Sequence, residues 1–244
     1  MTLVDQIFAQ ALVMVGRLSQ EQEELLKAVA AVGKPMIVLN SSGRPVDLHR
    51  IEGYADAIMQ IWHPGVCAGK AVAGLLSGRY NPSGKLAMTF PYNTGQIPIY
   101  YNRRNSGRRG TQGLYKDVQS EPLYEFGHGL SYSKFEYGPL TLSSDRITQD
   151  DPLVAELVRN VSDRDGLETV HWYICDPYSH ITRPVKELKF FEKKMIRAGE
   201  EVLFRFEIDP IRDLGFVDRT GRRYLDKGEY YIMVGQHKET IEVI

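Results

Sequence analysis

The segment SQEQEELLKAVAAVGKPMIVLN, residues 19–40, joins an amphipathic helix to a buried strand. Ser19, with Gln22 three residues later, forms a capping-box pattern, which predicts a helix that begins directly after Ser19. Gly33 suits the C-terminal end of that helix, because glycine adopts the left-handed conformation without steric cost. Apolar positions at helical spacing define the face that we expect to be buried, namely Leu25, Leu26, Val29 and Ala30.

The same alternation of helix and strand continues outward from this segment. Short apolar runs, each typical of a strand buried on both faces, occupy residues 11–15, 35–40, 56–62 and 86–90. Helical segments are expected between them, at about 47–54 and 66–76. Strands that alternate with helices predict a parallel sheet with right-handed crossovers. We therefore expect a doubly wound α/β sandwich over residues 1–138.

The end of this first domain, residues 91–137, is a long stretch rich in proline, glycine and tyrosine. So long an irregular stretch in a compact domain is usually functional or an interface. Its tyrosines could equally serve to pin the loop to the sandwich. The sequence leaves these two interpretations open.

After Pro139 the pattern changes to β-structure. Four segments favour strands through alternation or through β-branched and aromatic content, at residues 153–160, 168–175, 200–208 and 228–235. Turn signals separate them, and no helical segment intervenes. We expect an all-β domain, a β-sandwich, over residues 139–244, with the boundary near residues 137–145.

Composition limits the function classes. The chain has 244 residues, is 43% hydrophobic and 25% charged, and carries a net charge of -1. We therefore expect no nucleic-acid partner and no membrane association. The first residues lack the features of a signal peptide, which predicts a cytoplasmic location for the chain as written, although full-length relatives could be exported. Cys67 and Cys175 are interpreted as buried small apolar residues rather than as a disulfide or a zinc site.

Cofactor and metal motifs are absent from the sequence. His63 and His128 lack partners at metal-ligand spacing, and a structural role is favoured for both. GHGLSY does not fit the nucleophile elbow of hydrolases, because Ser131 lacks the flanking glycines. No phosphate-binding loop is present. We expect no cofactor and no bound metal.

Five turn and loop motifs nevertheless follow one another in a specific order: WHPG (62–65), GRYNPSGKLAMTFP (78–91), GQIPIYYN (95–102), NSGR (105–108) and PLYEFGHGLSYSKFEY (122–137). Together they resemble the C-terminal half of glycoside hydrolase family 3, of the β-glucosidase and β-xylosidase type. VRNVSDRDGLETVHWYICDP (158–177) and YLDKGEYYIMVG (224–235) resemble the fibronectin type III-like domain that closes many family members.

The resemblance implies retaining hydrolysis of a β-linked sugar, which needs two carboxyl groups. It places the nucleophile, an aspartate, on a preceding barrel domain that has no counterpart in this sequence. It places the acid/base glutamate in a loop before the first helix. Here that loop is only Gly16 to Leu18, without the S-G-E and L-P-x-x-Q elements of relatives. We therefore expect no catalytic residue in this chain and no activity from it alone.

The carboxylates nearest to that loop suit the start of a helix better than a catalytic role. Glu21, Glu23 and Glu24 fall in its first turns, where negative charge is favoured by the helix dipole. A sugar could instead contact aromatic faces together with amide, imidazole and guanidinium groups. The candidate substrate-binding residues are Trp62, His63, Tyr101, Asn102, Asn105 and Arg108. The alternative is that Trp62 is core and the others form a surface for barrel docking; the basic run around Arg108 also suits a solvated loop.

Three functional hypotheses follow. In the first, the chain is the C-terminal part of a β-glucosidase-type hydrolase and acts on an oligosaccharide or β-glycoside with a barrel domain or in a homo-oligomer. In the second, it is a non-catalytic carbohydrate-binding or protein-interaction module. In the third, it is a folded gene remnant.

Overall fold

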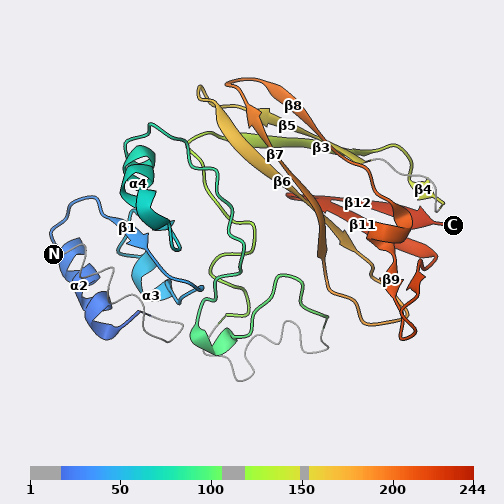
Figure 1. Cartoon of the computed structure of the whole chain (residues 1–244), viewed down its shortest axis with the longest axis horizontal. Helices are drawn as coiled ribbons and strands as arrows, with labels where there is room; N and C mark the ends of the chain where they lie inside the picture. Colours follow the sequence, from blue (N-terminus) through green and yellow to red (C-terminus); the bar gives the residue numbers. More distant parts are fainter. Residues whose placement is uncertain (1–17, 106–118, 149–153) are drawn as a thin grey trace. The chain divides into compact units, whose positions relative to one another are not determined.

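A computed structural model describes residues 18–105, 119–148 and 154–244 (Figure 1). The chain divides into two compact units. The first comprises Met1–Ser77, Leu86–Tyr101 and Gly110–His128, and the second comprises Gly78–Lys85, Asn102–Arg109 and Gly129–Ile244. The first unit carries the α/β layer and the second the β-sandwich, so the expected fold class, α/β followed by all-β, is confirmed.

Helix α2, Gln20–Ala30, begins as its sequence predicts. The Ser19 hydroxyl accepts a hydrogen bond from the Gln22 backbone N–H at 3.4 Å, and the Gln22 side chain accepts one from the Ser19 N–H at 3.0 Å. The two bonds satisfy backbone donors that a helix start leaves without intrahelical partners. The predicted capping box is therefore confirmed.

The predicted buried face of α2 is confirmed only in part, because Leu26 and Ala30 are partly buried and Leu25 and Val29 are not. Leu25 and Val29 are 43% and 45% exposed, whereas Glu23 is buried and Leu26 packs against the core. The reason is that α2 packs against helix α3, His49–Glu52, on the side that carries Glu23, which pairs with Arg50 of α3. Helical spacing identifies an apolar stripe, but the position of the neighbouring helix decides which side is covered.

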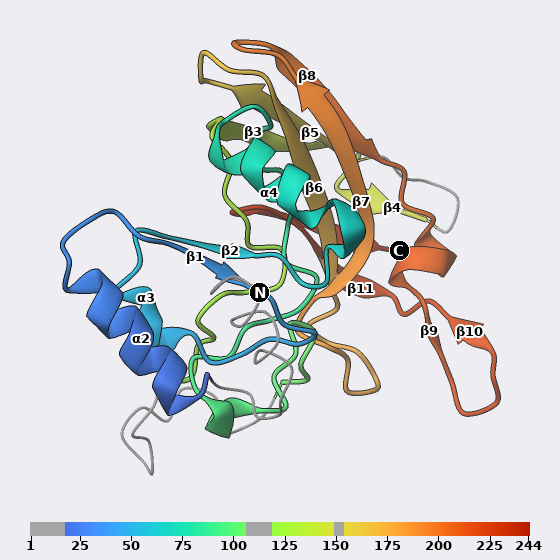
Figure 2. The ribbon, with the colours of Figure 1, turned by 60° about the vertical axis from the view of Figure 1, so that its left-hand side comes forward.

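Strands β1, Ile37–Asn40, and β2, Ala57–Gln60, pair in parallel, with Ile37 opposite Ala57 and Asn40 opposite Gln60 (Figure 2). Helix α3 lies in the connection between them, as expected for a strand–helix–strand crossover. The turn η1, Gly65–Cys67, and helix α4, Ala68–Leu76, follow β2. The strand expected at residues 11–15 lies outside the described residues.

The strand expected at residues 86–90 is not formed. The backbone of this segment bonds to the loop at residues 122–128 instead: Phe90 N–H donates to the Tyr124 carbonyl at 2.8 Å and Leu86 N–H to the His128 carbonyl at 2.7 Å. Phe90 is buried, with its ring edge-on to both Trp62 and Tyr124. The apolar run is thus buried by a loop rather than by a sheet. The turn η2, Thr94–Gln96, follows.

The second unit is a sandwich of two sheets. A five-stranded sheet has the order β4-β12-β11-β6-β7, and a three-stranded sheet has the order β3-β5-β8. The strands are β3 (Phe135–Leu142), β4 (Arg146–Ile147), β5 (Val154–Asn160), β6 (Gly166–Cys175), β7 (Glu187–Ile196), β8 (Glu201–Phe206), β11 (Gly228–Val234) and β12 (His237–Val243). A π-helical turn, Pro210–Leu214, precedes the hairpin of β9 (Phe216–Val217) and β10 (Arg223–Tyr224).

The predicted strands at 153–160, 168–175, 200–208 and 228–235 correspond to β5, β6, β8 and β11 and are confirmed. The sequence did not identify β3, β7 and β12. The inward residues of both sheets form one core around the fully buried Trp172, whose ring centroid lies 5.9 Å from that of Phe206.

The segment Gly78–Lys85 is tied to the β-sandwich by Asn81, in what we call the Asn81 clasp. The Asn81 amide oxygen accepts from the Ser131 hydroxyl and from the Tyr132 N–H, both at 2.9 Å. Its amide nitrogen donates to the Ser133 hydroxyl at 2.8 Å and to the Asp165 carbonyl at 2.9 Å. One side chain thereby joins three segments of the second unit.

Lys85 makes a second connection close to the clasp. Its ammonium group donates to the Gly129 carbonyl at 3.0 Å and pairs with the buried Glu168 carboxylate at 3.2 Å. The Tyr137 hydroxyl donates to the same carboxylate at 2.8 Å. A β-carbon on Gly129 would lie 2.2 Å from the Gly84 carbonyl oxygen, so this close approach requires glycine.

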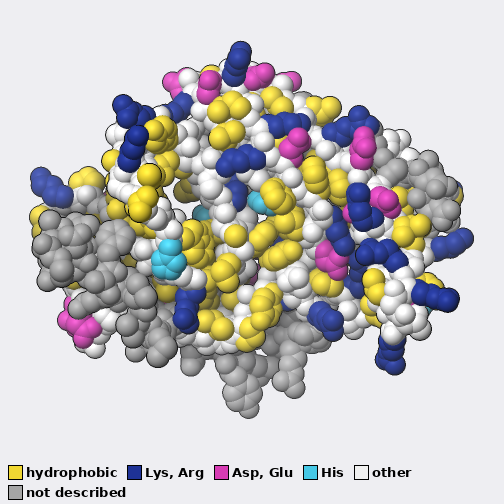
Figure 3. All heavy atoms as spheres, viewed as in Figure 1, with side chains coloured by type: hydrophobic (Ala, Val, Ile, Leu, Met, Phe, Trp, Pro, Cys, Tyr) yellow, Lys and Arg dark blue, Asp and Glu magenta, His cyan; other side chains and the backbone are white. Residues whose placement is uncertain are grey.

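Two further sequence expectations can be compared with the structure. Cys67 and Cys175 are both free, but neither is fully buried as expected: Cys67 is exposed in the turn η1, and Cys175 is half-buried. Lys and Arg side chains gather toward the right of the face shown in Figure 3, with Asp and Glu side chains between them. Among the described helices, none has the length and apolar character needed to cross a membrane.

Replacing Trp172 should create a large core cavity. We expect Trp172→Ala to lower the free energy of unfolding by about 3–5 kcal/mol, measured by urea denaturation followed by circular dichroism. Phe191→Ala on β7, where the side chain is 61% exposed, is the control and should change it by less than about 1 kcal/mol. A near-neutral Trp172→Ala would contradict the β6 register.

Replacing Asn81 should open the clasp. Asn81→Ala leaves the buried Ser133 hydroxyl and the Asp165 carbonyl without this partner, and we expect a loss of about 2 kcal/mol in the same measurement. Asn81→Asp keeps the acceptor but cannot donate, so it should be destabilising as well. Equal stability of Asn81→Asp and the parent would show that the donated bonds are unimportant.

Candidate functional site

The carboxyl ends of β1 and β2 form a polar edge in the first unit. Asn40 ends β1, and its amide nitrogen donates to the Gln60 side-chain oxygen on β2 and to the Ser42 hydroxyl at 3.3 Å. Gln60 donates to the Ser42 hydroxyl at 3.2 Å. Asn40 and Ser42 are buried. We call this arrangement the Asn40–Ser42–Gln60 network. Ligands of open parallel sheets bind beyond this end of the strands.

Trp62 is the second residue after β2 and has an unusual backbone. Its φ is +49°, in the left-handed region that bulky residues rarely adopt. The Ser41 hydroxyl donates to the Trp62 carbonyl at 2.8 Å. The indole is half-buried and contacts Phe90 with one edge. Trp62 therefore combines a core contact with a solvent-facing surface.

His63 is exposed beside this residue. Its Nε2 atom lies 2.8 Å from the position that a β-carbon on Gly43 would occupy. The imidazole thus lies directly over the Gly43 backbone, which belongs to the loop after β1. The structure brings Trp62 and His63 together at one edge of the sheet, as their sequence position indicated.

The remaining candidate residues lie elsewhere. Tyr101 belongs to the first unit, is half-buried and stacks on Phe126 with ring centroids 4.3 Å apart. Asn102 and Asn105 are exposed and belong to the second unit. The chain between them is held by a hydrogen bond from Val185 N–H to the Arg103 carbonyl at 2.8 Å. Arg108 lies outside the described residues.

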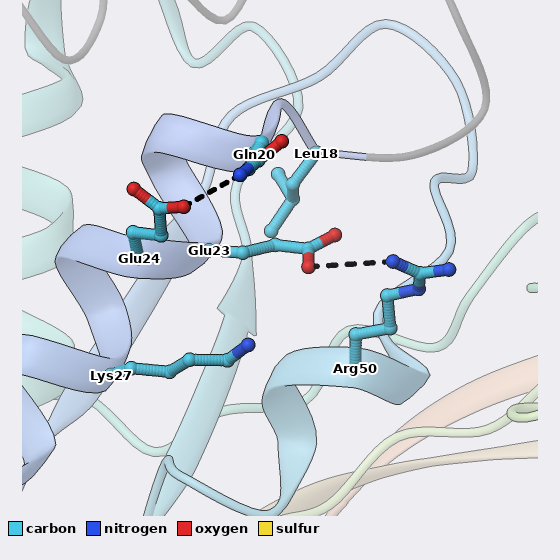
Figure 4. Close-up of a pocket in the computed structure, with 6 residues that line it drawn as sticks. All are labelled: Leu18, Gln20, Glu23, Glu24, Lys27 and Arg50. Atoms are coloured by element: carbon cyan, nitrogen blue, oxygen red, sulfur yellow. Dashed lines mark hydrogen bonds and ion pairs between the residues drawn. The ribbon is translucent and has the colours of Figure 1, made fainter.

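Glu23 and Glu24 line a polar hollow of about 280 Å³ beside α2 (Figure 4). Its other lining residues are Leu18, Gln20, Lys27 and Arg50. The Glu23 carboxylate points toward the Arg50 guanidinium and pairs with it at 3.7 Å. Glu24 accepts a hydrogen bond from Gln20 at 2.7 Å.

Glu21 serves the start of α2. Hydrogen bonds from its own backbone N–H and from Ser19 hold the pKa of its carboxyl below the usual value. A glycosidase general acid needs the opposite shift, because it must remain protonated until it protonates the leaving group. Glu21 therefore does not resemble a general acid.

The second histidine considered in the sequence has a packing role. His128 stacks on Tyr124 with ring centroids 5.0 Å apart, and Tyr124 donates to Glu52 at 3.3 Å. Another histidine, His49, contacts the Tyr92 hydroxyl at 2.5 Å. Over residues 18–105, 119–148 and 154–244, no group of three or more His, Cys, Asp or Glu side chains is placed to hold a metal ion.

Sequence reasoning missed Ser41, Gly43 and the Asn40–Ser42–Gln60 network. The available signal was a Ser-Ser-Gly turn directly after a buried strand, at the end where ligands of parallel sheets bind. The contacts to Trp62 and His63 could not be read from it, because those residues lie about twenty positions further along the chain.

Two family models match the chain. Residues 15–132 match the glycosyl hydrolase family 3 C-terminal domain, and residues 168–238 match the fibronectin type III-like domain. A periplasmic β-glucosidase of Salmonella typhimurium is 38% identical over 224 residues, which are 88% of this chain and 29% of that protein. A putative β-xylosidase of Formosa agariphila is 36% identical over 216 residues, with 88% and 28% covered.

Solved structures agree with this assignment. The crystal structure of a β-glucosidase from Listeria innocua in complex with isofagomine matches with a TM-score of 0.87 at 37% identity, over 93% of this chain and 33% of that one. The chain thus spans about a third or less of these relatives. It belongs to glycoside hydrolase family 3, as the C-terminal α/β sandwich and fibronectin type III-like domain of the family's β-glucosidase and β-xylosidase type.

Proposed function

We propose that this chain supplies the non-catalytic C-terminal part of a β-glycoside hydrolase, in which a barrel domain on the same or another polypeptide carries the nucleophile. The supporting observation is that the carboxylates beside the acid/base position are engaged within α2 and α3. Glu23 pairs with Arg50, Glu24 accepts from Gln20, and the pKa of Glu21 is lowered. The chain alone does not hydrolyse glycosides.

The chemistry of the reaction explains why these groups are insufficient. Retaining hydrolysis uses one carboxylate as nucleophile and one carboxylic acid as proton donor, about 5–5.5 Å apart across the scissile bond. The Glu23 carboxylate is already paired with the Arg50 guanidinium, and Glu24 accepts from Gln20 on the same helix. In the proposed enzyme, a barrel contributes the nucleophile, while this chain contributes part of the sugar-binding wall.

Trp62 and His63 are the wall residues that the geometry supports best. They lie at the carboxyl end of parallel strands, and both have surface open to solvent. An indole face offers a stacking surface to the C–H groups of a sugar ring, and an imidazole can exchange hydrogen bonds with its hydroxyl groups. This exposure also favours the second candidate function, a carbohydrate-binding module without turnover.

One prediction of the proposed function concerns the activity of the chain alone. Incubated at high concentration with nitrophenyl α- and β-glycosides, the purified protein should release no nitrophenol above the background rate. The expected reason is that the described carboxylates beside the acid/base position are already engaged by Arg50 and Gln20. Turnover that survives repurification and is abolished by Glu23→Gln would contradict the proposal.

A chimera with a natural barrel tests whether this chain lacks the general acid/base, because the host then supplies the nucleophile. The matched C-terminal segment of the Listeria innocua β-glucosidase would be replaced by this chain, so that the host contributes the rest of its sequence. We expect hydrolysis of 2,4-dinitrophenyl β-glucoside, whose leaving group needs no protonation. We expect little hydrolysis of laminaribiose, a sugar seen in complex with a mutant of the Listeria innocua β-glucosidase. Azide should accelerate the reaction by replacing water as the attacking nucleophile. Hydrolysis of laminaribiose at the rate of the unaltered host would show that this chain contains an acid/base residue.

A substitution of Tyr101 distinguishes a sugar-binding role of this residue from a structural role. Because its ring stacks on Phe126, Tyr101→Ala should reduce stability by about 1–2 kcal/mol, and Tyr101→Phe, which keeps the stacked ring, should reduce it less. Thermal unfolding measures both variants. An unchanged Tm for Tyr101→Ala, together with loss of laminaribiose binding, would instead identify Tyr101 as a sugar contact.

A further inference from the structure

The turn of Trp62 and His63 is held in a conformation that its own residues do not favour. A left-handed backbone costs a bulky residue such as tryptophan roughly 1–2 kcal/mol. It persists only where surrounding contacts over-determine it, and such residues cluster at functional sites. The parallel ladder ends just before the turn, with Ile61 N–H donating to the Asn40 carbonyl at 2.9 Å. Trp62 directly follows Ile61, the last residue with a hydrogen bond of this ladder.

Ser41 is the polar contact that fixes the turn. Its hydroxyl donates to the Trp62 carbonyl at 2.8 Å, which sets the orientation of the peptide between Trp62 and His63. Ser41 is itself flanked by Asn40 and Ser42, which are both buried and hydrogen-bonded to each other and to Gln60. The bond therefore originates from a residue whose two neighbours are buried and hydrogen-bonded.

Gly43 leaves the space that the imidazole of His63 occupies. A β-carbon at this position would lie 2.8 Å from His63 Nε2, which is closer than real contacts allow. The atom in conflict is the far end of an exposed, flexible side chain rather than backbone. A methyl group at position 43 would therefore move the imidazole and leave the fold intact.

We propose that Ser41 and Gly43 are positioning residues that hold Trp62 and His63 for recognition of a β-linked glucose unit. Ser41 sets the indole through the Trp62 carbonyl, and Gly43 sets the imidazole by the absence of a side chain. The sugar class rests on the proposed function, whereas the positioning rests on the contacts of the turn. A turn held only for packing would need neither residue for binding.

The test uses the full chain with laminaribiose as the probe and the fluorescence of Trp62 as the readout. Trp172 is fully buried, so acrylamide quenching and sugar-dependent changes report on Trp62. Ser41→Ala should change the quenching of Trp62 and weaken laminaribiose binding about five- to tenfold, the effect of one lost hydrogen bond. Ser41→Thr retains the hydroxyl and should restore both values.

Ser77→Ala is the matched control. Ser77 also donates from its hydroxyl to a backbone carbonyl of the first unit, that of Gly74 at 3.3 Å. It should change neither quenching nor binding. Equal effects of Ser41→Ala and Ser77→Ala would overturn the role of Ser41.

A double-mutant cycle tests Gly43. Gly43→Ala should weaken laminaribiose binding about threefold or more, with an unchanged Tm. In a His63→Ala background it should have no further effect, because Gly43 acts through the imidazole. Equal losses in both backgrounds would overturn this role.

The outcomes separate the two proposals. A parent chain without a saturable response to laminaribiose overturns the sugar assignment, while the quenching of Ser41→Ala still decides whether Ser41 positions Trp62. Turnover by the chain alone would refute the proposed function and leave the positioning result standing.

Discussion

The attachment of the segment Gly78–Lys85 to the β-sandwich depends on a single amide, that of Asn81. Its oxygen accepts two hydrogen bonds and its nitrogen donates two, so the whole hydrogen-bonding capacity of the side chain is used. These bonds fix the segment Gly78–Lys85 to the chain before β3 and to the turn before β6. Lys85, Glu168 and Tyr137 continue the connection with a buried ion pair and a hydroxyl donor.

This constraint explains the most distinctive sequence motifs. The N-P-S-G-K segment and the G-L-S-Y-S segment lie far apart in the chain, yet the Asn81 clasp and the close approach of Gly129 to Gly84 join them. Asn81 and Lys85 of the first segment hydrogen-bond to Gly129, Ser131, Tyr132 and Ser133 around the second. The polar, glycine-rich G-L-S-Y-S segment therefore serves to connect two parts of the second unit rather than to carry out catalysis.

The first unit uses polar residues differently. At the carboxyl ends of β1 and β2, a buried network of Asn40, Ser42 and Gln60 supports a loop rather than joining segments. The adjacent turn stores strain at Trp62 and leaves the side chains of Trp62 and His63 partly open to solvent. Rigid support beneath a strained, accessible turn is the arrangement expected of a binding element, because such residues must be held before a ligand arrives.

Local chemistry allowed part of this structure to be predicted. The cap at Ser19 and Gln22 depends on residues three positions apart, and the alternating strands β6 and β11 carry their burial pattern in their own sequence. Strand β3 contains Gly138 and Pro139, and β7 and β12 are rich in charged residues. These residues are unfavourable or uncommon in strands, so the three strands form because neighbouring strands pair with them. The family resemblance added the order of domains and the absence of a catalytic pair as an expectation.

The sequence by itself determined the fold class, the start of α2 and the place of Trp62 and His63 just beyond the carboxyl end of a parallel strand. Only the tertiary structure decided which face of α2 is buried, that residues 86–90 bond to a loop, and that Ser41 and Gly43 contact the turn of Trp62 and His63. The physical reason is the separation along the chain of the residues that interact. Caps and alternation depend on neighbours within one turn or one strand, whereas burial and positioning depend on segments that the chain brings together only after it folds.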